Sequence, residues 1–145
     1  MNLFTIGFTG KSAEKFFGLL ESSKATKLID IRINRTSQLA GFAKEQDLKF
    51  FLPKLVGMQY LVREDLAPTK ELLASYRDKE ITWEVFSQKY QGLVKERGTL
   101  ESCTPADFEN SVLLCSESEP EKCHRTLLAG LIVKRFPNLG ITHLI

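Results

Sequence analysis

Cysteine, histidine and arginine residues gather in the C-terminal third of the sequence, and these residue types can perform thiol chemistry. Cys115 ends an apolar run, and Cys123, His124 and Arg125 follow after seven intervening residues. A thiolate close to helix amides and a cation is a nucleophile, so Cys115 and the neighbouring Glu117 are candidate catalytic residues. Cys123, His124 and Arg125 are candidate ligand-binding residues. The Cys115–Arg125 spacing is longer than in the cysteine phosphatase loop.

The same residues raise the question of a metal, and their spacing argues against one. Cys115 and Cys123 are too far apart in sequence for the usual zinc hook. On a helix, the adjacent Cys123 and His124 would point about 100° apart. We therefore expect no metal and no cofactor, with both cysteines reduced. The alternative to a reactive Cys115 is that both cysteines are small, buried core residues.

A second group of charged residues follows the second apolar run. Asp30 and Arg32 share one face of this segment, because alternate residues of a strand point to the same side. A buried charged pair is costly unless it is paired or used. Arg32 and Arg35 are therefore candidate anion ligands, and Asp30 a candidate base or a residue that orients an arginine. The alternative is a purely structural ion pair.

A glycine turn follows the first apolar run. Gly7, Thr9 and Gly10 precede Lys11 and Ser12, and backbone amides at a helix start attract anions. The glycine spacing is shorter than in the Walker A motif, so an ATP-type phosphate loop is not indicated. Gly7, Thr9 and Gly10 are candidate ligand contacts, and the alternative is a tight turn between a strand and a helix.

The elements that must position these residues alternate along the chain. Short apolar runs predict strands over residues 3–6, 27–32, 58–62, 111–115 and 141–145. Amphipathic periods between them predict helices. This alternation predicts an α/β fold, a single domain over residues 1–145, with a mainly parallel sheet and helices on both faces in a Rossmann-like three-layer arrangement.

Parallel strands bring their carboxyl ends, where ligands bind, to one edge. The residues expected to line one cavity there are Asp30, Arg32, Cys115, Glu117 and Arg125, with Gly7, Thr9 and Gly10 at its rim.

Local signals indicate where the helices begin and end. Ser12 and Thr82 are expected N-caps. Residues 45–56 have a helical period that Pro53 interrupts. Pro68 is expected in the first turn of the next helix. The segment that starts at Ser118 combines a hydroxyl, a proline and acidic residues, which is typical of a helix start.

Composition narrows the class of protein without naming a function. The 145 residues are 43% apolar and 26% charged, as in ordinary globular domains, and no apolar run is long enough for a membrane span. The start of the sequence lacks the pattern of a secretory signal. Three cysteines without such a signal indicate a reducing compartment, so we expect a cytoplasmic protein with no membrane partner.

The sequence resembles the family catalogued as domain of unknown function 488. The resemblance rests mainly on residues 113–117, Leu-Leu-Cys-Ser-Glu, followed by Cys-His-Arg at 123–125, and more weakly on residues 5–7 and 28–32. Members usually show Ile-Gly-His-Ser after the first strand, where this chain has Phe8 and Thr9. The resemblance implies the fold and the site, and it leaves open whether this chain is catalytic.

The sequence is compatible with three functions. The first is an enzyme, or a pocket derived from one, that handles a nucleotide or another small anionic ligand, because basic residues and a glycine turn converge at one edge. The alternative is a nucleic-acid-associated domain without catalytic activity, in which Phe42 or Tyr60 would stack on bases. The third is a structural metal or redox module built on Cys115 and Cys123. The sequence does not indicate an oligomeric state.

Overall fold

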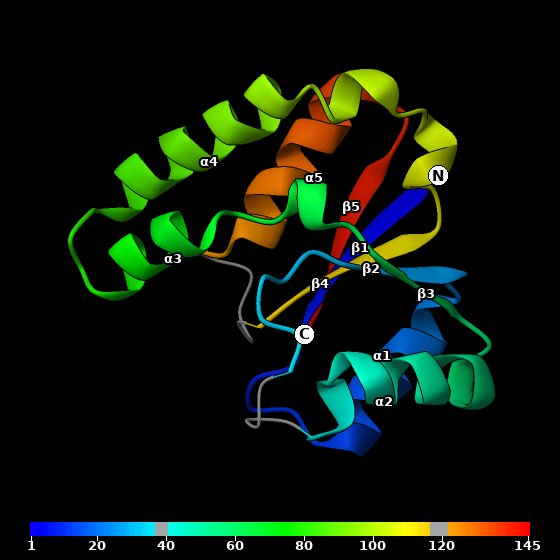
Figure 1. Ribbon diagram of the computed structural model, residues 1–145. Helices are drawn as coiled ribbons and strands as arrows, with labels where there is room; N and C mark the ends of the chain where they lie inside the picture. The colour runs from blue at the N-terminus through cyan, green and yellow to red at the C-terminus, as the bar shows by residue number, and fades with distance from the viewer. Residues whose placement is uncertain (37–40, 117–121) are drawn as a thin grey trace.

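The structure is a computed structural model that describes residues 1–36, 41–116 and 122–145. In chain order, its helices and strands are β1 (Asn2–Gly7), α1 (Ala13–Ser23), β2 (Lys27–Asp30), α2 (Glu45–Phe51), β3 (Gln59–Val62), α3 (Lys70–Arg77), α4 (Trp83–Arg97), β4 (Ser111–Cys115), α5 (His124–Arg135) and β5 (Gly140–Leu144). Figure 1 shows the strands between two groups of helices. The predicted three-layer α/β architecture with a parallel sheet is confirmed.

The sheet has the strand order β3-β2-β4-β1-β5, and each pairing between its neighbours is parallel. The register places Gly7 of β1 opposite Cys115 of β4, and Asp30 of β2 opposite Leu114. The carboxyl ends of β1, β2 and β4 therefore meet at one edge, as the alternation of strands and helices predicts.

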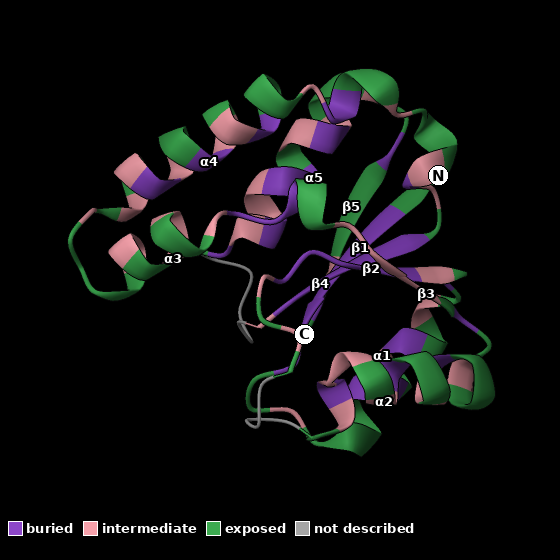
Figure 2. Cartoon of the chain, viewed as in Figure 1, coloured by how far each residue is buried: buried purple, intermediate pink, exposed green. Residues whose placement is uncertain are grey.

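Alternating residues of the strands divide the core between the two faces of the sheet. Phe4, Leu28 and Val112 pack with buried residues of α1 and α2. Leu3 and Leu113 pack on the opposite face with buried residues of α4 and α5. Figure 2 shows this burial in the strands and on the inward sides of the helices. Both faces are covered, which explains why β4 is buried along its whole length.

Helix boundaries follow the expected caps, with two differences. Ser12 caps α1 and Thr82 caps α4, each accepting a hydrogen bond from a backbone amide three residues later. The segment 45–56 is α2 followed by one π-helical turn, Leu52–Val56, which contains Pro53. Pro68 does not lie in the first turn of α3, because the N-cap is Thr69.

The end of the second strand also differs from expectation. Strand β2 ends at Asp30 rather than at residue 32, although the Ile31 amide still donates to the Leu114 carbonyl at 3.3 Å. The expected helix start at residues 118–121 lies outside the described residues, and the described helix α5 begins at His124. No helix in the described part of the chain is both long enough and apolar enough to cross a membrane.

Candidate functional site

The carboxyl end of β4 lies where the connections of neighbouring strands diverge. The chain leaves β1 and β2 toward α1 and α2 on one face of the sheet, and it leaves β4 toward α5 on the other. Strand β4 lies between β2 and β1, so its end has a diverging connection on each side. Such a switch point opens a crevice at the strand ends, and ligands of α/β proteins bind there. Cys115 and Ser116 occupy this position.

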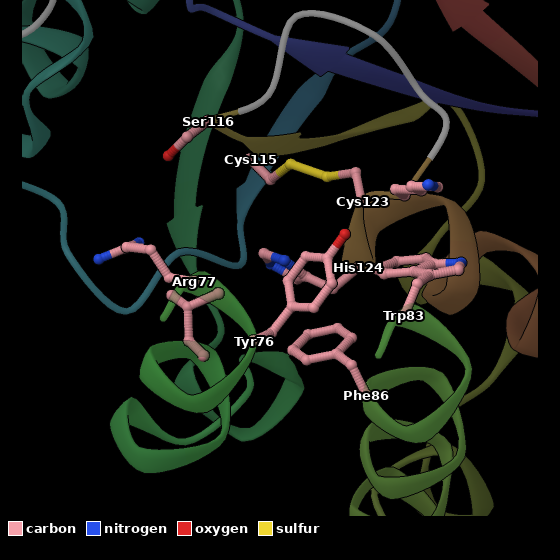
Figure 3. A pocket seen from close by; sticks show the side chains of 10 residues that line it. Tyr76, Arg77, Trp83, Phe86, Cys115, Ser116, Cys123 and His124 are labelled. Carbon is pink, nitrogen blue, oxygen red and sulfur yellow. A yellow bond between two sulfur atoms is a disulfide. The ribbon is translucent and has the colours of Figure 1, made fainter. Parts of the chain in front are cut away.

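Cys115 and Cys123 are joined by a disulfide, which Figure 3 shows above the pocket. The expectation of two reduced thiols is therefore wrong for this state of the chain. Cys115 ends β4 and Cys123 is the N-cap residue of α5, so the turn from strand to helix brings the two residues together. Spacing along the sequence does not reveal this approach. Residues 117–121, including Glu117, lie outside the described residues.

Arg125 places a cation against the two sulfurs. Its side chain is fully buried, and Nη1 lies 3.3 Å from Cys115 Sγ and 3.7 Å from Cys123 Sγ. A guanidinium at this distance favours the thiolate over the thiol whenever the cysteines are reduced. The structure thus brings together the Cys115, Cys123 and Arg125 that the sequence singled out.

His124 lies beside this group in the first turn of α5. Its Nε2 lies 3.0 Å from the Ile31 carbonyl oxygen. A carbonyl only accepts, so Nε2 carries the proton and Nδ1 keeps a free lone pair. The pKa of His124 is lowered to about 4, mainly by burial; the hydrogen bond to the Ile31 carbonyl opposes this shift, and the charge of Arg125 adds to it. The imidazole is therefore neutral near pH 7.

A pocket of about 130 Å³ opens in front of these residues. Figure 3 shows the rings of Tyr76, Trp83 and Phe86 on the side opposite the disulfide. The residues that line the pocket are Leu73, Tyr76, Arg77, Trp83, Phe86, Cys115, Ser116, Lys122, Cys123 and His124. One wall of the pocket is aromatic, and the cations Arg77 and Lys122 border it. Its base carries the sulfurs of Cys115 and Cys123 and the imidazole of His124.

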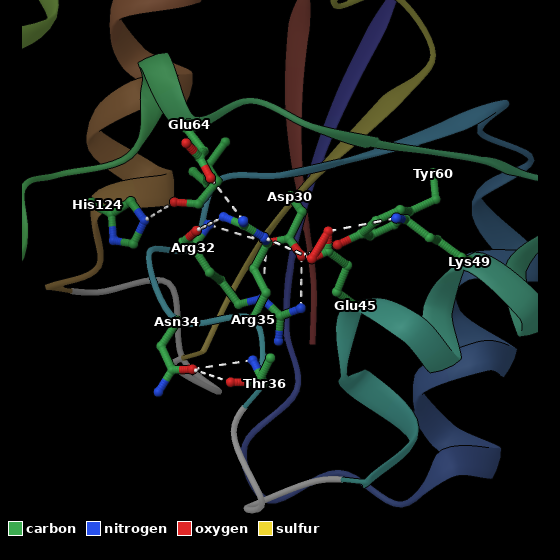
Figure 4. A network of polar contacts seen from close by, with 11 residues as sticks. Asp30, Arg32, Asn34, Arg35, Thr36, Glu45, Lys49, Tyr60, Glu64 and His124 are labelled. Carbon is green, nitrogen blue, oxygen red and sulfur yellow. Dashed lines mark hydrogen bonds and ion pairs between the residues drawn. The ribbon is translucent and has the colours of Figure 1, made fainter.

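Asp30 and Arg32, in contrast, form a closed ion pair that does not line this pocket. Arg32 Nε and Nη2 donate to the two Asp30 oxygens at 2.8 and 2.7 Å, and Tyr60 Oη donates to Asp30 Oδ2 at 2.6 Å (Figure 4). The Arg32 guanidinium lies 5.2 Å from the centre of the Phe8 ring. Asp30 and Arg32 are both buried. The described geometry matches the structural alternative, a paired charge that fixes the loop after β2.

Arg35 is also engaged within the chain. It donates to Glu45 at 3.2 Å and to Glu64 at 2.8 Å (Figure 4). Burial lowers the pKa of Arg35, but the hydrogen bonds to Glu64 and Glu45 outweigh this effect and raise it overall. Arg35 lines a second hollow of about 570 Å³ together with Lys70 and Arg77. Because Arg77 borders both hollows, they adjoin at this side chain.

The glycine turn after β1 supports the edge without lining the pocket. The Thr9 amide donates to the Ser116 carbonyl at 3.0 Å, and the Lys11 amide donates to the Phe8 carbonyl at 3.1 Å. Gly10 has a φ of 78°, a conformation that favours glycine. Gly7 pairs with Cys115 in the sheet. These contacts match the alternative of a tight strand-to-helix turn, tied to the end of β4.

The two aromatic residues expected to stack on nucleic-acid bases are occupied by contacts within the chain. The Phe42 ring lies 5.3 Å from the Phe16 ring and 5.9 Å from the Phe17 ring, centre to centre. Tyr60 is half-buried, and its hydroxyl is bonded to Asp30. Neither ring is presented as a stacking platform.

Sequence reasoning missed the aromatic and basic wall of the pocket. Tyr76, Trp83 and Phe86 have the helical period of core residues, and Arg77 begins a charged stretch that is typical of a solvated turn. The signal that could have identified these residues is their position in the sequence. The three large aromatic residues flank the short turn between α3 and α4. Only the packing of that turn against the start of α5 shows that they face Cys123 and His124.

Comparison with known proteins gives a family and no described function. The family model described as "Domain of unknown function DUF488" matches residues 12–132. No curated protein and no solved structure matches the chain.

Proposed function

The chain belongs to the DUF488 family of domains, and within that family we propose that its pocket at the end of β4 binds a small anionic ligand with a planar ring. Nucleotides and phosphorylated aromatic compounds form this class. One observation carries the proposal: three aromatic rings and two cations border a single pocket whose base holds Cys115 and His124. Planar rings and negative charge are the features that such a lining recognises.

The aromatic wall is preassembled. The Trp83 and Phe86 rings are stacked at 5.3 Å, and the Tyr76 ring lies 5.4 Å from the Trp83 ring. Tyr76 and Trp83 are only half-buried, so part of each ring is available to a ligand. Stacking of a base on an aromatic side chain contributes about 1–3 kcal/mol. The pocket volume of about 130 Å³ suits a single ring system rather than a large cofactor.

The anionic part of the ligand would lie toward Arg77. In the second hollow, Glu45 and Glu64 neutralise Arg35, whereas Lys70 and Arg77 have no ion pair with any residue the structure describes. A ligand whose ring enters the aromatic pocket would therefore place its phosphate where Arg77 and Lys70 meet. Leu73 and Arg77 line both hollows, and Arg77 is the charged residue of the two.

Reactive groups stand at the base of the same pocket. Cys115 supplies a sulfur held against Arg125, and we assign to it any chemistry on the ligand once the disulfide is reduced. Asp30 is a positioning residue, because its carboxylate holds Arg32 and the loop after β2. The position of Glu117 in sequence keeps it a candidate at this edge.

Calorimetry on the reduced protein tests the proposal. We expect a nucleoside monophosphate to bind more tightly than inorganic phosphate, and Arg77→Gln to weaken its binding about 10-fold or more, as loss of a charged hydrogen bond does. Lys15→Gln is the matched control: it removes the same charge from an exposed position on α1, across the sheet. Equal binding by wild type and Arg77→Gln would contradict the proposal. Tighter, steeply salt-dependent binding of long oligonucleotides would favour the nucleic-acid alternative.

A further inference from the structure

We propose that Cys115, Cys123 and His124 form a zinc site when the disulfide is reduced, with an open fourth position that faces the pocket. The inference rests on the geometry of these three residues and does not depend on the ligand class proposed above. It reverses the expectation of a metal-free site.

The three ligand atoms already lie close together. Cys115 Sγ, Cys123 Sγ and a ring nitrogen of His124 are all within 4.8 Å of one another. Thiolate and imidazole ligands of a tetrahedral zinc are about 3.5–3.8 Å apart, as follows from zinc–sulfur and zinc–nitrogen bonds of about 2.3 and 2.0 Å. The Cα atoms of the cysteines are 7.7 Å apart, so the two sulfurs can separate to this spacing with the backbone in place.

Cys123 and His124 are not both helical, so the angular offset that argued against a shared metal does not separate their side chains. Cys123 is the N-cap residue and has extended dihedral angles, φ −130° and ψ 139°, whereas His124 is the first helical residue. The offset of about 100° holds only between two helical neighbours. The change of conformation between Cys123 and His124 lets both side chains face the end of β4.

The surroundings resemble the outer shell of a metal centre. His124 Nε2–H donates to the Ile31 carbonyl, which leaves Nδ1 as the metal-binding nitrogen. A backbone carbonyl commonly fixes the tautomer of a metal-bound histidine in this way. Arg125 Nη1 donates toward both sulfurs, which lowers the charge density on two thiolates held side by side.

Ligand type and count indicate which metal and which kind of site. Two thiolates and one imidazole suit zinc better than magnesium or calcium, which bind oxygen ligands. Three protein ligands with an open position are typical of catalytic rather than structural zinc. All three residues line the same pocket as the aromatic wall, so a ligand there would reach the open position. Zinc would take the place of free Cys115 thiolate as the reactive group.

The disulfide and the metal are mutually exclusive states of the same sulfurs. Oxidation by hydrogen peroxide would remove two electrons from the two zinc-bound thiolates, form the Cys115–Cys123 bond, release Zn²⁺, and reduce the peroxide with two protons to two water molecules. The disulfide form described here is then the metal-free state.

Metal analysis of the full chain tests the site. The protein is reduced with a phosphine, incubated with zinc, freed of excess metal and assayed for zinc per chain. We expect one zinc per chain, and about 100-fold weaker binding in Cys115→Ser, Cys123→Ser and His124→Gln, since loss of a direct ligand should cost at least as much as the roughly 10–100-fold loss that follows removal of an outer-shell partner. Cys103→Ser is the matched control, because Cys103 is the free cysteine outside the cluster and should leave binding unchanged.

Cobalt(II) added to the reduced wild type provides a second readout that needs no variant to fold. A thiolate-to-cobalt charge-transfer band that disappears after treatment with peroxide supports the site, and its absence overturns it. A zinc content of the wild type no higher than that of Cys115→Ser also overturns the site. So does a zinc content of Cys103→Ser that is reduced as much as that of Cys115→Ser. Repeating the calorimetry with and without zinc separates the two proposals: zinc binding without nucleotide binding contradicts only the proposed function, and nucleotide binding without zinc binding contradicts only the metal site.

Discussion

Single side chains at the carboxyl edge of the sheet show how this chain keeps charge in its interior. Asp30 is fully buried, yet its two oxygens accept hydrogen bonds from the Arg32 side chain and amide and from Tyr60. Burial first, and then the charge of Asp30, raise the pKa of Tyr60, so the phenol stays protonated and donates. A buried charge is tolerated only when its hydrogen-bonding capacity is met in this way.

The Tyr60 hydroxyl therefore contributes measurable stability. We expect Tyr60→Phe to lower the free energy of unfolding by about 1.5 kcal/mol, the lower end for a hydrogen bond to a charged group, because the phenol is only half-buried. Urea denaturation of the two proteins measures the difference. Tyr76→Phe is the control, since the Tyr76 hydroxyl has no hydrogen bond with a described residue and its loss should cost less than about 0.5 kcal/mol. Equal losses in both variants would contradict the role assigned to the Asp30 contact.

At the scale of elements, the turn between α3 and α4 builds the aromatic wall of the pocket. Trp83 is the first residue of α4, and Thr82 caps that helix by accepting a hydrogen bond from the Val85 amide at 3.2 Å. Tyr90, two turns further along α4, donates to the Leu66 carbonyl at 2.6 Å and anchors the helix to the segment before α3. The start of α4 is thus held at its cap and along its buried face, which positions Trp83 toward Cys123.

Removing the cap should loosen the pocket wall as well as the helix. We expect Thr82→Ala to cost about 1 kcal/mol of stability, the usual effect of losing an N-cap side chain. Thr82→Ser, which keeps the acceptor, should cost only a few tenths of a kcal/mol. Trp83 is the only tryptophan in the sequence, so its fluorescence reports on the wall directly. A Thr82→Ala protein with unchanged stability and an unchanged Trp83 emission spectrum would show that the cap does not position this residue.

Across the whole molecule, the sequence predicts the layers better than the site. The strands at residues 111–115 and 3–6 are apolar enough to be recognised, because a parallel sheet covered on both faces needs apolar residues throughout. The strand order depends on which crossover each helix takes, and no local pattern encodes it. Arg32 illustrates the same limit within the site: its type and position suggest a ligand contact, but pairing with Asp30 and packing on Phe8 depend on the folded loop.

The aromatic wall of the pocket could not be predicted from the sequence for a different reason. A stripe of aromatics at helical spacing predicts a core face equally well whether or not one edge of that face stays open to a ligand. Trp83 and Phe86 meet both descriptions, since Phe86 is buried in the core and Trp83 is half-buried at the pocket. The distinction requires the distance between α4 and the start of α5, which is a property of the assembled molecule.

The two histidines of the chain give the assembled molecule a dependence on pH. His143 lies in the edge strand β5 but bonds through Nδ1 to Thr5 Oγ1 of β1 at 2.6 Å. Burial, and then the charge of Arg125 from α5, lower the pKa of His143 below its ordinary value of 6.5. His124 is lowered in the same direction. Folding thus weakens proton binding at both residues, so the unfolded chain binds more protons as the pH falls below about 6.5.

We therefore expect the free energy of unfolding to decrease as the pH is lowered from 7 to 5, and His143→Gln to reduce this slope. Glutamine can still bond to Thr5 but does not titrate, so the slope that remains in the variant belongs to His124. Urea denaturation of reduced, zinc-free wild type and variant at several pH values between 7 and 5 measures both slopes, and Lys15→Gln should retain the slope of the wild type. The same loss of stability in wild type and His143→Gln would mean that folding does not shift the pKa of His143, and a wild type that gains stability toward pH 5 would reverse the sign for both histidines.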